Sequence, residues 1–225
     1  MQLFISDDFK KNKNKIIIKE KRIVNQLRKV LRAKTWYNFL LQNKVWNIVR
    51  YELKLESIQD TITANIKNIQ ENNKKPKNKW IIQSILNKVS KMELIVQKLT
   101  EVGVPKIYFI WTNRGVFKNI KDNKLERFEK IALEASEQSM SWYMPEIKVI
   151  KSFNEISWNK AIVNFDGKDF KKVDFSNIDF LVIGPEWGFD DKDIENIQAK
   201  ENIYLWQKVL RSETASIIWG FILMS

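Results

Sequence analysis

One polar loop in this 225-residue chain carries the residue types that charge-stabilising or acid–base chemistry needs. In LWQKVLRSETAS (205–216), Arg211, Ser212, Glu213 and Thr214 follow one apolar run and precede another. A guanidinium can stabilise negative charge that develops on a substrate, and a carboxylate can accept a proton. The structural alternative is that Ser212 or Thr214 caps a following helix while Arg211 and Glu213 form an ion pair. Spacing alone leaves both interpretations open.

A second segment, FLVIGPEWGF (180–189), joins a buried-strand pattern to the turn GPEWG. Glycine permits positive φ and lets the backbone approach a ligand closely. Both segments follow apolar strands, and ligands of parallel α/β sheets bind beyond the carboxyl ends of the strands. Neither segment matches a P-loop or a G-x-G-x-x-G fingerprint, so spacing does not name the ligand. An ordinary strand-to-helix turn is the alternative here.

The composition excludes several kinds of site. The chain has no cysteine and no histidine. This rules out a disulfide scaffold, a zinc site built on Cys or His, a catalytic cysteine and a histidine general base. We therefore expect no metal. No apolar run approaches the ~18 residues of a membrane span, and the N-terminus does not resemble a signal peptide, so we expect a cytoplasmic protein.

Positive charge is concentrated in the N-terminal third. Residues 1–75 hold 17 of the 39 basic and 7 of the 27 acidic residues, a net charge of +10, and residues 76–225 have a net charge of +2. The two parts meet near residues 70–79, in the polar, proline-broken run ENNKKPKNK, which has the composition of a linker. Such asymmetry indicates a basic module that binds a polyanion, although a lysine-rich proteome would also produce it.

The N-terminal part is predicted to form a small β-barrel or sandwich. Short β-rich stretches follow one another closely, at 3–5, 15–20, 36–42, 46–57 and 61–69. Residues 22–32 instead repeat apolar side chains at helical spacing, and the opposite face is basic. That face either binds RNA or is simply solvated. Its charged residues are Arg22, Arg28, Lys29 and Arg32.

The C-terminal part is predicted to be an α/β domain with a mostly parallel sheet, because continuous apolar strands alternate with amphipathic helices. Gly103 is placed to end the first of these helices, and Asp190 or Asp191 to begin the third. The expected strands are 80–86, 106–112, 146–150, 161–165, 180–184 and 202–206, and the expected helices are 90–104, 125–140, 191–198 and 214–225.

Four motifs occur in fixed order along the chain. They are KMELIVQKLTEVGV (91–104), EASEQS (134–139) followed by MPEI (144–147), LVIGPEWGF (181–189) and LWQKVLRSETA (205–215). With these motifs the chain resembles the methyltransferases that make N3-methyluridine in 16S ribosomal RNA, which belong to the SPOUT superfamily of knotted methyltransferases. Residues 28–34, RKVLRAK, also resemble the segment that opens the PUA-like RNA-binding barrel of that family.

The resemblance implies a PUA-like barrel over 1–72, a trefoil-knotted α/β domain over 78–225, a homodimer, and S-adenosylmethionine as cofactor. It implies that Arg211 and Glu213 lie at the reacting centre, with Arg211 stabilising charge and Glu213 orienting it or accepting the proton. The expected partner is 16S RNA or the small ribosomal subunit. The residues implied to bind the cofactor are Phe165, Gly167, Gly184, Pro185, Glu186, Trp187, Gly188, Leu205, Trp206, Leu210 and Thr214.

Tryptophan stands where the family motifs have glycine, at Trp187 and Trp206 and, by a weaker match, at Trp36 and Trp142. Indoles at the first two positions are expected to occupy the cofactor's volume. With 9 Trp and only 6 Gly in the chain, one hypothesis is that UGA codons encode glycine in the source organism. Ser141 also replaces the usual arginine.

Two alternative functions remain open from the sequence. One is a SPOUT methyltransferase with a different RNA target. The other is a ribosome-assembly factor that binds RNA without catalysis, which would follow if the indoles block the cofactor site.

Overall fold

The computed structural model describes residues 1–44, 48–115, 120, 122–204 and 209–225, without the side chain of Phe165. The chain divides into two compact units. The first contains Met1–Lys75 and Ser136–Trp142, and the second contains Pro76–Ala135 and Tyr143–Ser225. The division falls within the polar linker, but no sequence pattern indicates that residues 136–142 belong with the N-terminal unit.

A six-stranded, mostly antiparallel sheet forms the first unit, in the order β1-β4-β5-β6-β3-β2. Only β1 and β4 pair in parallel. Alternating residues of the long strands β5 and β6 bury one face, as a period of two requires. Strand β2 lies in a lysine-rich run and was not predicted. The strands are β1 (Gln2–Ile5), β2 (Phe9–Asn12), β3 (Lys15–Ile18), β4 (Asn38–Gln42), β5 (Ile48–Ile58) and β6 (Ile62–Asn72).

The predicted helix 22–32 is shorter and less regular than its apolar spacing suggested. Helix α1 (Lys21–Asn25) continues as a π-helical turn, Gln26–Val30. Ile23 and Leu27 are fully buried, whereas Val30 and Leu31 are exposed. The wider π-turn shifts the last two apolar side chains off the buried face, so the stripe expected from a 3.6-residue period is wrong beyond Leu27.

Ionic contacts hold residues 136–142 within the first unit. Glu137 accepts hydrogen bonds from the backbone N–H of Ile5 at 2.8 Å and from the Arg22 guanidinium at 2.9 Å. Burial raises the pKa of Glu137, although both hydrogen bonds act in the opposite direction. The Arg50 guanidinium lies 3.8 Å from the ring centroid of Trp142, a cation–π contact. These contacts join parts of the chain that are about a hundred residues apart.

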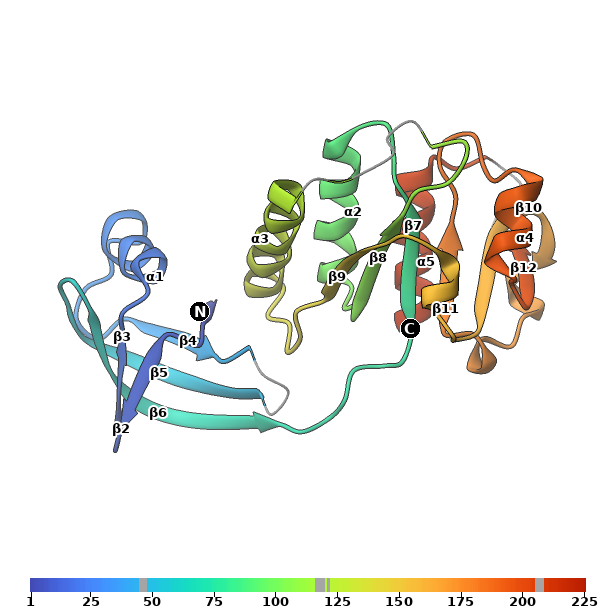
Figure 1. Cartoon of the computed structure of the whole chain (residues 1–225). Coiled ribbons are helices and arrows are strands. Elements are labelled where there is room, and N and C mark those ends of the chain that lie inside the picture. The colour runs from blue at the N-terminus through green and yellow to red at the C-terminus, as the bar shows by residue number, and fades with distance from the viewer. Residues whose placement is uncertain (45–47, 116–119, 121, 205–208) are drawn as a thin grey trace. The chain divides into compact units, whose positions relative to one another are not determined.

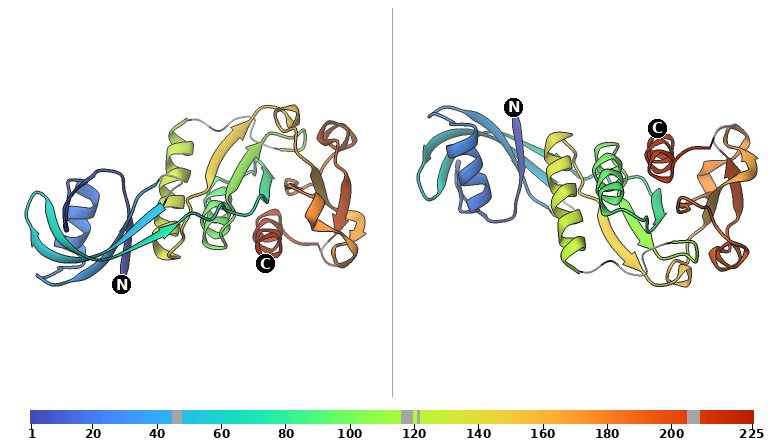
Figure 2. Two further views of the ribbon diagram at one scale, coloured as in Figure 1. Left: turned by 90° about the horizontal axis from the view of Figure 1, so that it is seen from below. Right: turned by 90° about the horizontal axis from the view of Figure 1, so that it is seen from above.

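A six-stranded parallel sheet forms the second unit, in the order β12-β10-β11-β7-β8-β9 (Figures 1 and 2). The predicted parallel α/β architecture is confirmed. The strands are β7 (Trp80–Ser84), β8 (Lys106–Ile110), β9 (Glu146–Ile150), β10 (Lys160–Asp169), β11 (Phe180–Ile183) and β12 (Glu201–Tyr204), and the helices are α2 (Val89–Glu101), α3 (Asp122–Gln138), α4 (Asp191–Ile197) and α5 (Ser212–Met224).

Hydrophobic cores cover both faces of this sheet. On one face, side chains such as Ile81 and Leu181 pack with residues of α2, α3 and α5. On the other, their strand neighbours Ile82 and Val182 pack with residues of α4. Burial on both sides explains why the strands are continuously apolar. Gly220 allows α5 to approach α2 closely, because a Cβ at that position would lie 2.3 Å from a Leu99 methyl carbon.

Two of the three predicted helix boundaries are confirmed. Gly103 follows the end of α2 with φ of +86°, and Asp190 caps α4 through a reciprocal capping box with Asp193. The predicted cap of α5 is wrong. Its N-cap is Arg211, with no side-chain cap, since the Ser212 hydroxyl instead donates to the Gly184 carbonyl oxygen.

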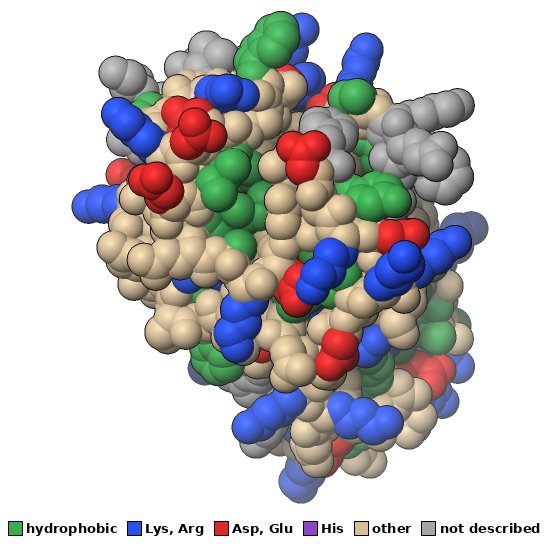
Figure 3. Space-filling model, turned by 90° about the vertical axis from the view of Figure 1, so that its right-hand side faces the viewer, with side chains coloured by type: hydrophobic (Ala, Val, Ile, Leu, Met, Phe, Trp, Pro, Cys, Tyr) green, Lys and Arg blue, Asp and Glu red, His purple; other side chains and the backbone are tan. Residues whose placement is uncertain are grey.

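No helix within the described residues is long and apolar enough to cross a membrane. On the face drawn in Figure 3, basic and acidic side chains alternate, with hydrophobic side chains between them.

Trp36 occupies a backbone conformation that favours glycine. Its φ is +78°, and its indole is 66% exposed beneath the Lys54 ammonium, 4.0 Å from the ring centroid. A positive φ costs a bulky L-residue about 1–2 kcal/mol, and the exposed cation–π contact returns about 0.5–1 kcal/mol. We therefore expect Trp36→Gly to raise the free energy of unfolding by about 0.5–1 kcal/mol in urea titrations.

Trp187→Gly is the matched control for this prediction. Trp187 is also exposed, but its φ is not positive, so glycine should bring no gain there. Equal changes in the two variants would contradict the backbone explanation.

Candidate functional site

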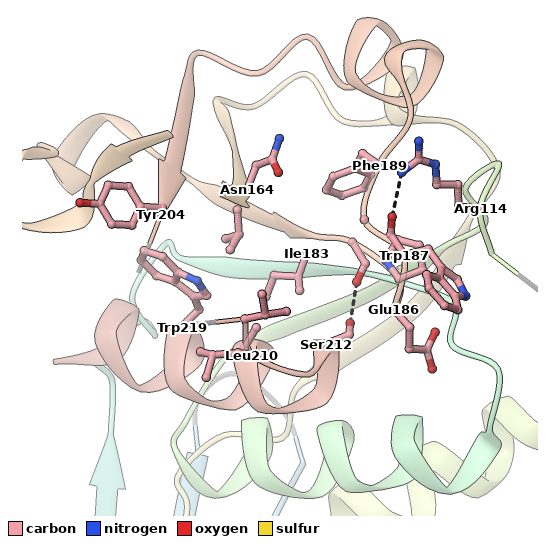
Figure 4. A pocket seen from close by; sticks show the side chains of 16 residues that line it. Arg114, Asn164, Ile183, Glu186, Trp187, Phe189, Tyr204, Leu210, Ser212 and Trp219 are labelled. Atoms are coloured by element: carbon pink, nitrogen blue, oxygen red, sulfur yellow. Dashed lines mark hydrogen bonds between the residues drawn. The ribbon is translucent and has the colours of Figure 1, made fainter. Parts of the chain in front are cut away.

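A cavity of about 350 Å³ lies beyond the carboxyl ends of β10, β11 and β12, next to the first turns of α5 (Figure 4). This is the edge at which parallel α/β sheets bind ligands. The volume lies within the usual ~300–1,000 Å³ range of small-molecule sites. The described residues that line it are Arg114, Val163, Asn164, Ile183, Gly184, Pro185, Glu186, Trp187, Gly188, Phe189, Tyr204, Val209, Leu210, Ser212, Ala215 and Trp219.

A buried hydrogen-bond network fixes the floor of the cavity. The Gln83 side chain, at the end of β7, donates to the hydroxyl of Ser212 at 3.0 Å and to the Gly184 carbonyl at 3.4 Å. It also accepts from the hydroxyl of Ser216. All these groups are buried. A satisfied polar network in a buried place holds its members in one arrangement, so the GPEWG turn and the start of α5 are locked together.

A cluster of three charged residues lies beside the same turn. The Lys91 ammonium, at the start of α2, is 2.7 Å from a Glu186 carboxylate oxygen and 3.7 Å from Glu213 Oε2. That Glu213 oxygen is buried and accepts no hydrogen bond within the described part of the chain. Lys91 is therefore the cation that compensates Glu213. The sequence suggested Arg211 for this role.

Arg211 is exposed and forms no ion pair with Glu213 in the described structure. It directly precedes Ser212, which lines the cavity. Its guanidinium is thus available at the cavity margin, where the hypothesis that it contacts a substrate stays a prediction.

The turn GPEWG is oriented by Arg114, which donates to the Trp187 carbonyl oxygen at 2.8 Å (Figure 4). The indole of Trp187 is 75% exposed. Trp187 lines the cavity, but its ring lies largely in solvent, so the expectation that it fills the cofactor volume stays a prediction.

Trp219 also lines the cavity, as a buried indole, and sequence reasoning missed it as a site residue. Its side chain is fully buried, and its ring N–H has no hydrogen-bond partner within the described residues. A buried, unpaired donor costs about 1–3 kcal/mol. A ligand acceptor at this wall of the cavity would remove that cost. Trp219 lies about two turns into α5, outside every motif, so the sequence shows only that this helix is apolar.

The structure brings about half of the expected cofactor residues to the cavity. Six of them line it: Gly184, Pro185, Glu186, Trp187, Gly188 and Leu210. Glu213 and Thr214 lie in the first turn of α5 and are not among the described lining residues.

The remaining expected cofactor residues are placed elsewhere or lie outside the description. Gly167 packs against β12, where a Cβ would lie 2.4 Å from the backbone nitrogen of Ile203. Close packing between the two strands therefore explains why glycine occupies this position. Phe165 lies in β10, but its side chain is outside the described part. Leu205 and Trp206 also lie outside the described residues.

The four basic residues of the predicted RNA face differ in how free they are. The Arg22 guanidinium donates hydrogen bonds to Glu20, Glu137 and the Ile5 carbonyl oxygen, so its donors are already used within the protein. Arg28, Lys29 and Arg32 are exposed. Of these, Arg28 donates to the Gln59 carbonyl. Arg28, Lys29 and Arg32 are therefore the residues of the predicted RNA face whose side chains are accessible, and their contact with RNA stays a prediction.

A family model identifies the domain to which this cavity belongs. Residues 73–224 match the RNA methyltransferase domain. This chain belongs to the RNA methyltransferase domain family.

Curated members of the family include relatives that extend beyond this domain. A ribosomal RNA small subunit methyltransferase E from Mesomycoplasma hyopneumoniae is 29% identical over 163 residues, covering 68% of this chain and 71% of the relative. The protein of the same name from Buchnera aphidicola is 27% identical over 246 aligned positions, covering 96% of this chain and 90% of the relative.

Solved structures of the family have the same fold. The ribosomal RNA small subunit methyltransferase E from Neisseria gonorrhoeae, crystallised with S-adenosyl methionine, has a TM-score of 0.85 at 22% identity, covering 99% of this chain and 96% of that one. A Legionella pneumophila methyltransferase with the same cofactor has a TM-score of 0.81 at 21% identity, covering 99% and 95%. At these identities the likeness establishes the α/β fold.

Proposed function

We propose that this chain is an S-adenosylmethionine-dependent methyltransferase that modifies N3 of a specific uridine in 16S ribosomal RNA. The observation that carries the proposal is the cavity at the carboxyl edge of the sheet, bounded by the GPEWG turn and by Val209 and Leu210, which precede Arg211. The names of the curated relatives support the substrate class. Since ribosomal RNA is the proposed substrate, we place the activity in the cytoplasm.

The residues present fit S-adenosylmethionine. With the Trp219 ring already in its wall, the cavity still measures about 350 Å³. The Trp219 N–H, which has no partner among the described residues, offers a donor to an adenine or ribose acceptor. When bound, the cofactor supplies an electrophilic methyl group. The cavity must then hold that methyl in line with the uracil nitrogen, which alone contributes several kcal/mol to catalysis.

The protein's own residues have to stabilise the negative charge that develops on the uracil and accept the proton that leaves N3. As N3 loses its proton, negative charge spreads to the uracil carbonyl oxygens. Arg211 directly precedes the lining residue Ser212, is exposed and forms no ion pair among the described residues, which suits it to stabilise that charge. Glu213 is two residues further on, and its buried carboxylate is the nearest candidate to accept the proton or to orient its neighbours. No histidine or cysteine is available for either role.

Methylation of purified particles tests this proposal. Small ribosomal subunits that lack the modification would be incubated with the protein and methyl-labelled S-adenosylmethionine, and digested RNA would be analysed for N3-methyluridine. Label in N3-methyluridine of 16S RNA is the expected result. In a parallel incubation with total transfer RNA, label there and none in the subunits would favour a different RNA target. RNA binding without label, and without calorimetric cofactor binding, would favour an assembly factor.

We also propose the finer architecture that the family resemblance implies. The sheet β1–β6 would be a PUA-like barrel that binds RNA, and the segment that ends in α5 would form a trefoil knot. The apolar outer face of α5 supports a homodimer, because Ile217, Ile218 and Ile222 are only partly buried and Phe221 is 62% exposed.

We expect Phe221→Glu to convert a dimer into a monomer. The substitution places a charge in the middle of the apolar face of α5, where burial against a partner would be costly. Light scattering at micromolar concentration measures the mass. Ile194→Glu, at an exposed apolar position of α4, is the control and should leave the dimer intact. A monomeric mass for the unmodified protein would contradict the dimer.

We expect Arg28→Glu, Lys29→Glu and Arg32→Glu together to weaken RNA binding and to flatten its salt dependence. Each lost phosphate contact lowers the slope of log affinity against log salt by roughly 0.7–0.9. Fluorescence anisotropy with labelled 16S fragments at several salt concentrations measures both quantities. Cofactor affinity should be unchanged. Equal losses of RNA and cofactor binding would mean that these residues support the fold.

A further inference from the structure

A second hollow lies at the opposite, amino-terminal edge of the same sheet, away from the cavity described above. It is formed where β10 begins, where the 3₁₀ turn Phe153–Glu155 ends, and where α4 leads into β12. Its volume is about 350 Å³. The described residues that line it are Asn154, Ile156, Ser157, Trp158, Asn159, Lys160, Gln198 and Lys200.

The chemistry of this lining is basic and amide-rich. Two lysines and three carboxamides line the hollow, and no described lining residue is acidic. Ser157 and Asn154 are exposed at its rim. Such a set offers hydrogen-bond donors from several directions and has no fixed negative charge, which favours an anionic ligand.

Lys160 is the decisive residue, because it is a buried cation without a counter-ion. Only 8% of it is exposed. Its ammonium donates one hydrogen bond, at 2.9 Å, to the Ile156 carbonyl oxygen, and it forms no salt bridge with a described residue. Burial lowers the pKa of Lys160. Buried charges in proteins are normally paired, so a missing partner here indicates a partner from outside the chain.

The neighbouring acidic side chains are already engaged elsewhere. Glu155 accepts hydrogen bonds from the backbone N–H groups of Lys151 and Ser152. Asp179 accepts from the backbone N–H of Asn159. Glu201 pairs with Lys168. The two unused donors of the Lys160 ammonium therefore remain available to a ligand in the hollow.

We propose that this hollow binds a phosphate-type oxyanion, with Lys160 as its principal charge partner and Lys200 and the carboxamides as further donors. A tetrahedral oxyanion accepts hydrogen bonds on all sides, which matches donors from β10, from the segment between α4 and β12, and from the 3₁₀ turn. The ligand is either a free phosphate compound or a phosphate of an RNA backbone. The site is independent of the cavity at the other edge and of the activity proposed for it.

Titration with inorganic phosphate tests the site on the full-length protein. Thermal unfolding would be followed over increasing phosphate, with sodium chloride keeping the ionic strength constant. We expect a saturable rise in Tm, and Lys160→Met should weaken the fitted affinity at least about tenfold, as loss of a charge-assisted hydrogen bond implies. Lys192→Met, an exposed lysine of α4 outside the hollow, removes the same charge and should behave like the unmodified protein.

A second variant leaves Lys160 in place. Ser157→Asp puts a carboxylate at the rim, which should repel phosphate and pair with Lys160, so it should abolish the phosphate-dependent shift while the protein remains folded. The proposal is overturned if the unmodified protein shows no saturable shift, or if all variants shift equally.

The source of the oxyanion is decided by an RNA competition. An eight-residue oligouridylate would be titrated into the same variants, with and without saturating phosphate. Weaker RNA binding by Lys160→Met than by Lys192→Met, together with competition by phosphate, assigns the site to the RNA backbone. Equal RNA affinities in both variants, with phosphate binding lost only in Lys160→Met, assign it to a free phosphate compound.

Discussion

Replacing Arg211 by alanine is expected to lower the turnover number for methyl transfer about a hundredfold, while S-adenosylmethionine binds with nearly unchanged affinity. Loss of one donor aimed at developing charge typically costs about 10²–10³ in rate. Arg211 is exposed at the N-cap of α5 and makes no ion pair in the described structure, so its removal should not change Tm. Single-turnover kinetics with saturating cofactor, and calorimetry of cofactor binding, measure the two effects separately.

Arg114→Ala is the matched control at the same cavity. Arg114 lines the cavity and holds the Trp187 carbonyl, so its loss should loosen the turn and weaken cofactor binding more than turnover at saturation. The role assigned to Arg211 fails if its alanine variant loses cofactor affinity in proportion to activity, or unfolds at a clearly lower temperature.

Local pattern was enough to predict the architecture of the second unit. The central strands β7 and β11 are buried on both faces and are mostly apolar, and Gly103 and Asp190 mark the end of α2 and the start of α4. Strand β2 escaped prediction because FKKN, at the edge of the sheet, buries almost nothing. The π-turn after α1 also has no sequence signal, since the apolar spacing continues through it.

The sequence was enough to predict where along the chain the site lies, but not which side chains contact one another there. The turn 184–188 and the start of α5 were identified because motifs mark them. Gln83, Trp219 and the pairing of Lys91 with Glu213 depend on which elements the fold brings side by side, and spacing along the chain does not contain that information. Arg211 and Glu213 are close in sequence, yet the start of a helix directs one side chain to solvent and the other toward α2.

The tryptophans illustrate the same limit. Motif comparison placed Trp36 and Trp187 in one class, as residues in glycine positions. The backbone separates them, because Trp36 has a φ of +78° and Trp187 has no positive φ. The hypothesis of misassigned UGA codons therefore has a physical motive at Trp36 that it lacks at Trp187. Inspection of the two codons tests it.

The charge cluster beside the cavity should be sensitive to the loss of its cation. We expect Lys91→Met to reduce the free energy of unfolding by about 1–3 kcal/mol, because it leaves Glu186 and the mostly buried Glu213 without compensation. Removing one partner of a fully buried ion pair costs about 3–5 kcal/mol, and partial solvent access reduces that value here. Lys98→Met, which removes the solvent-exposed partner of Glu101 on the same helix, should cost under about 0.5 kcal/mol.

A double-mutant cycle shows whether Glu213 is the group that Lys91 serves. Glu213→Gln removes the buried charge, so Lys91→Met should cost at least about 1 kcal/mol less in the glutamine background. Urea unfolding of the four proteins gives this coupling energy, and additive losses would mean that Lys91 acts only through Glu186.

The turnover number for methyl transfer, measured on the same four proteins, shows whether Glu213 has a catalytic role as well as a structural one. If Glu213 accepts the uridine proton, methyl transfer stays low in the double variant although its stability recovers, whereas recovery of both would leave Glu213 a purely structural charge.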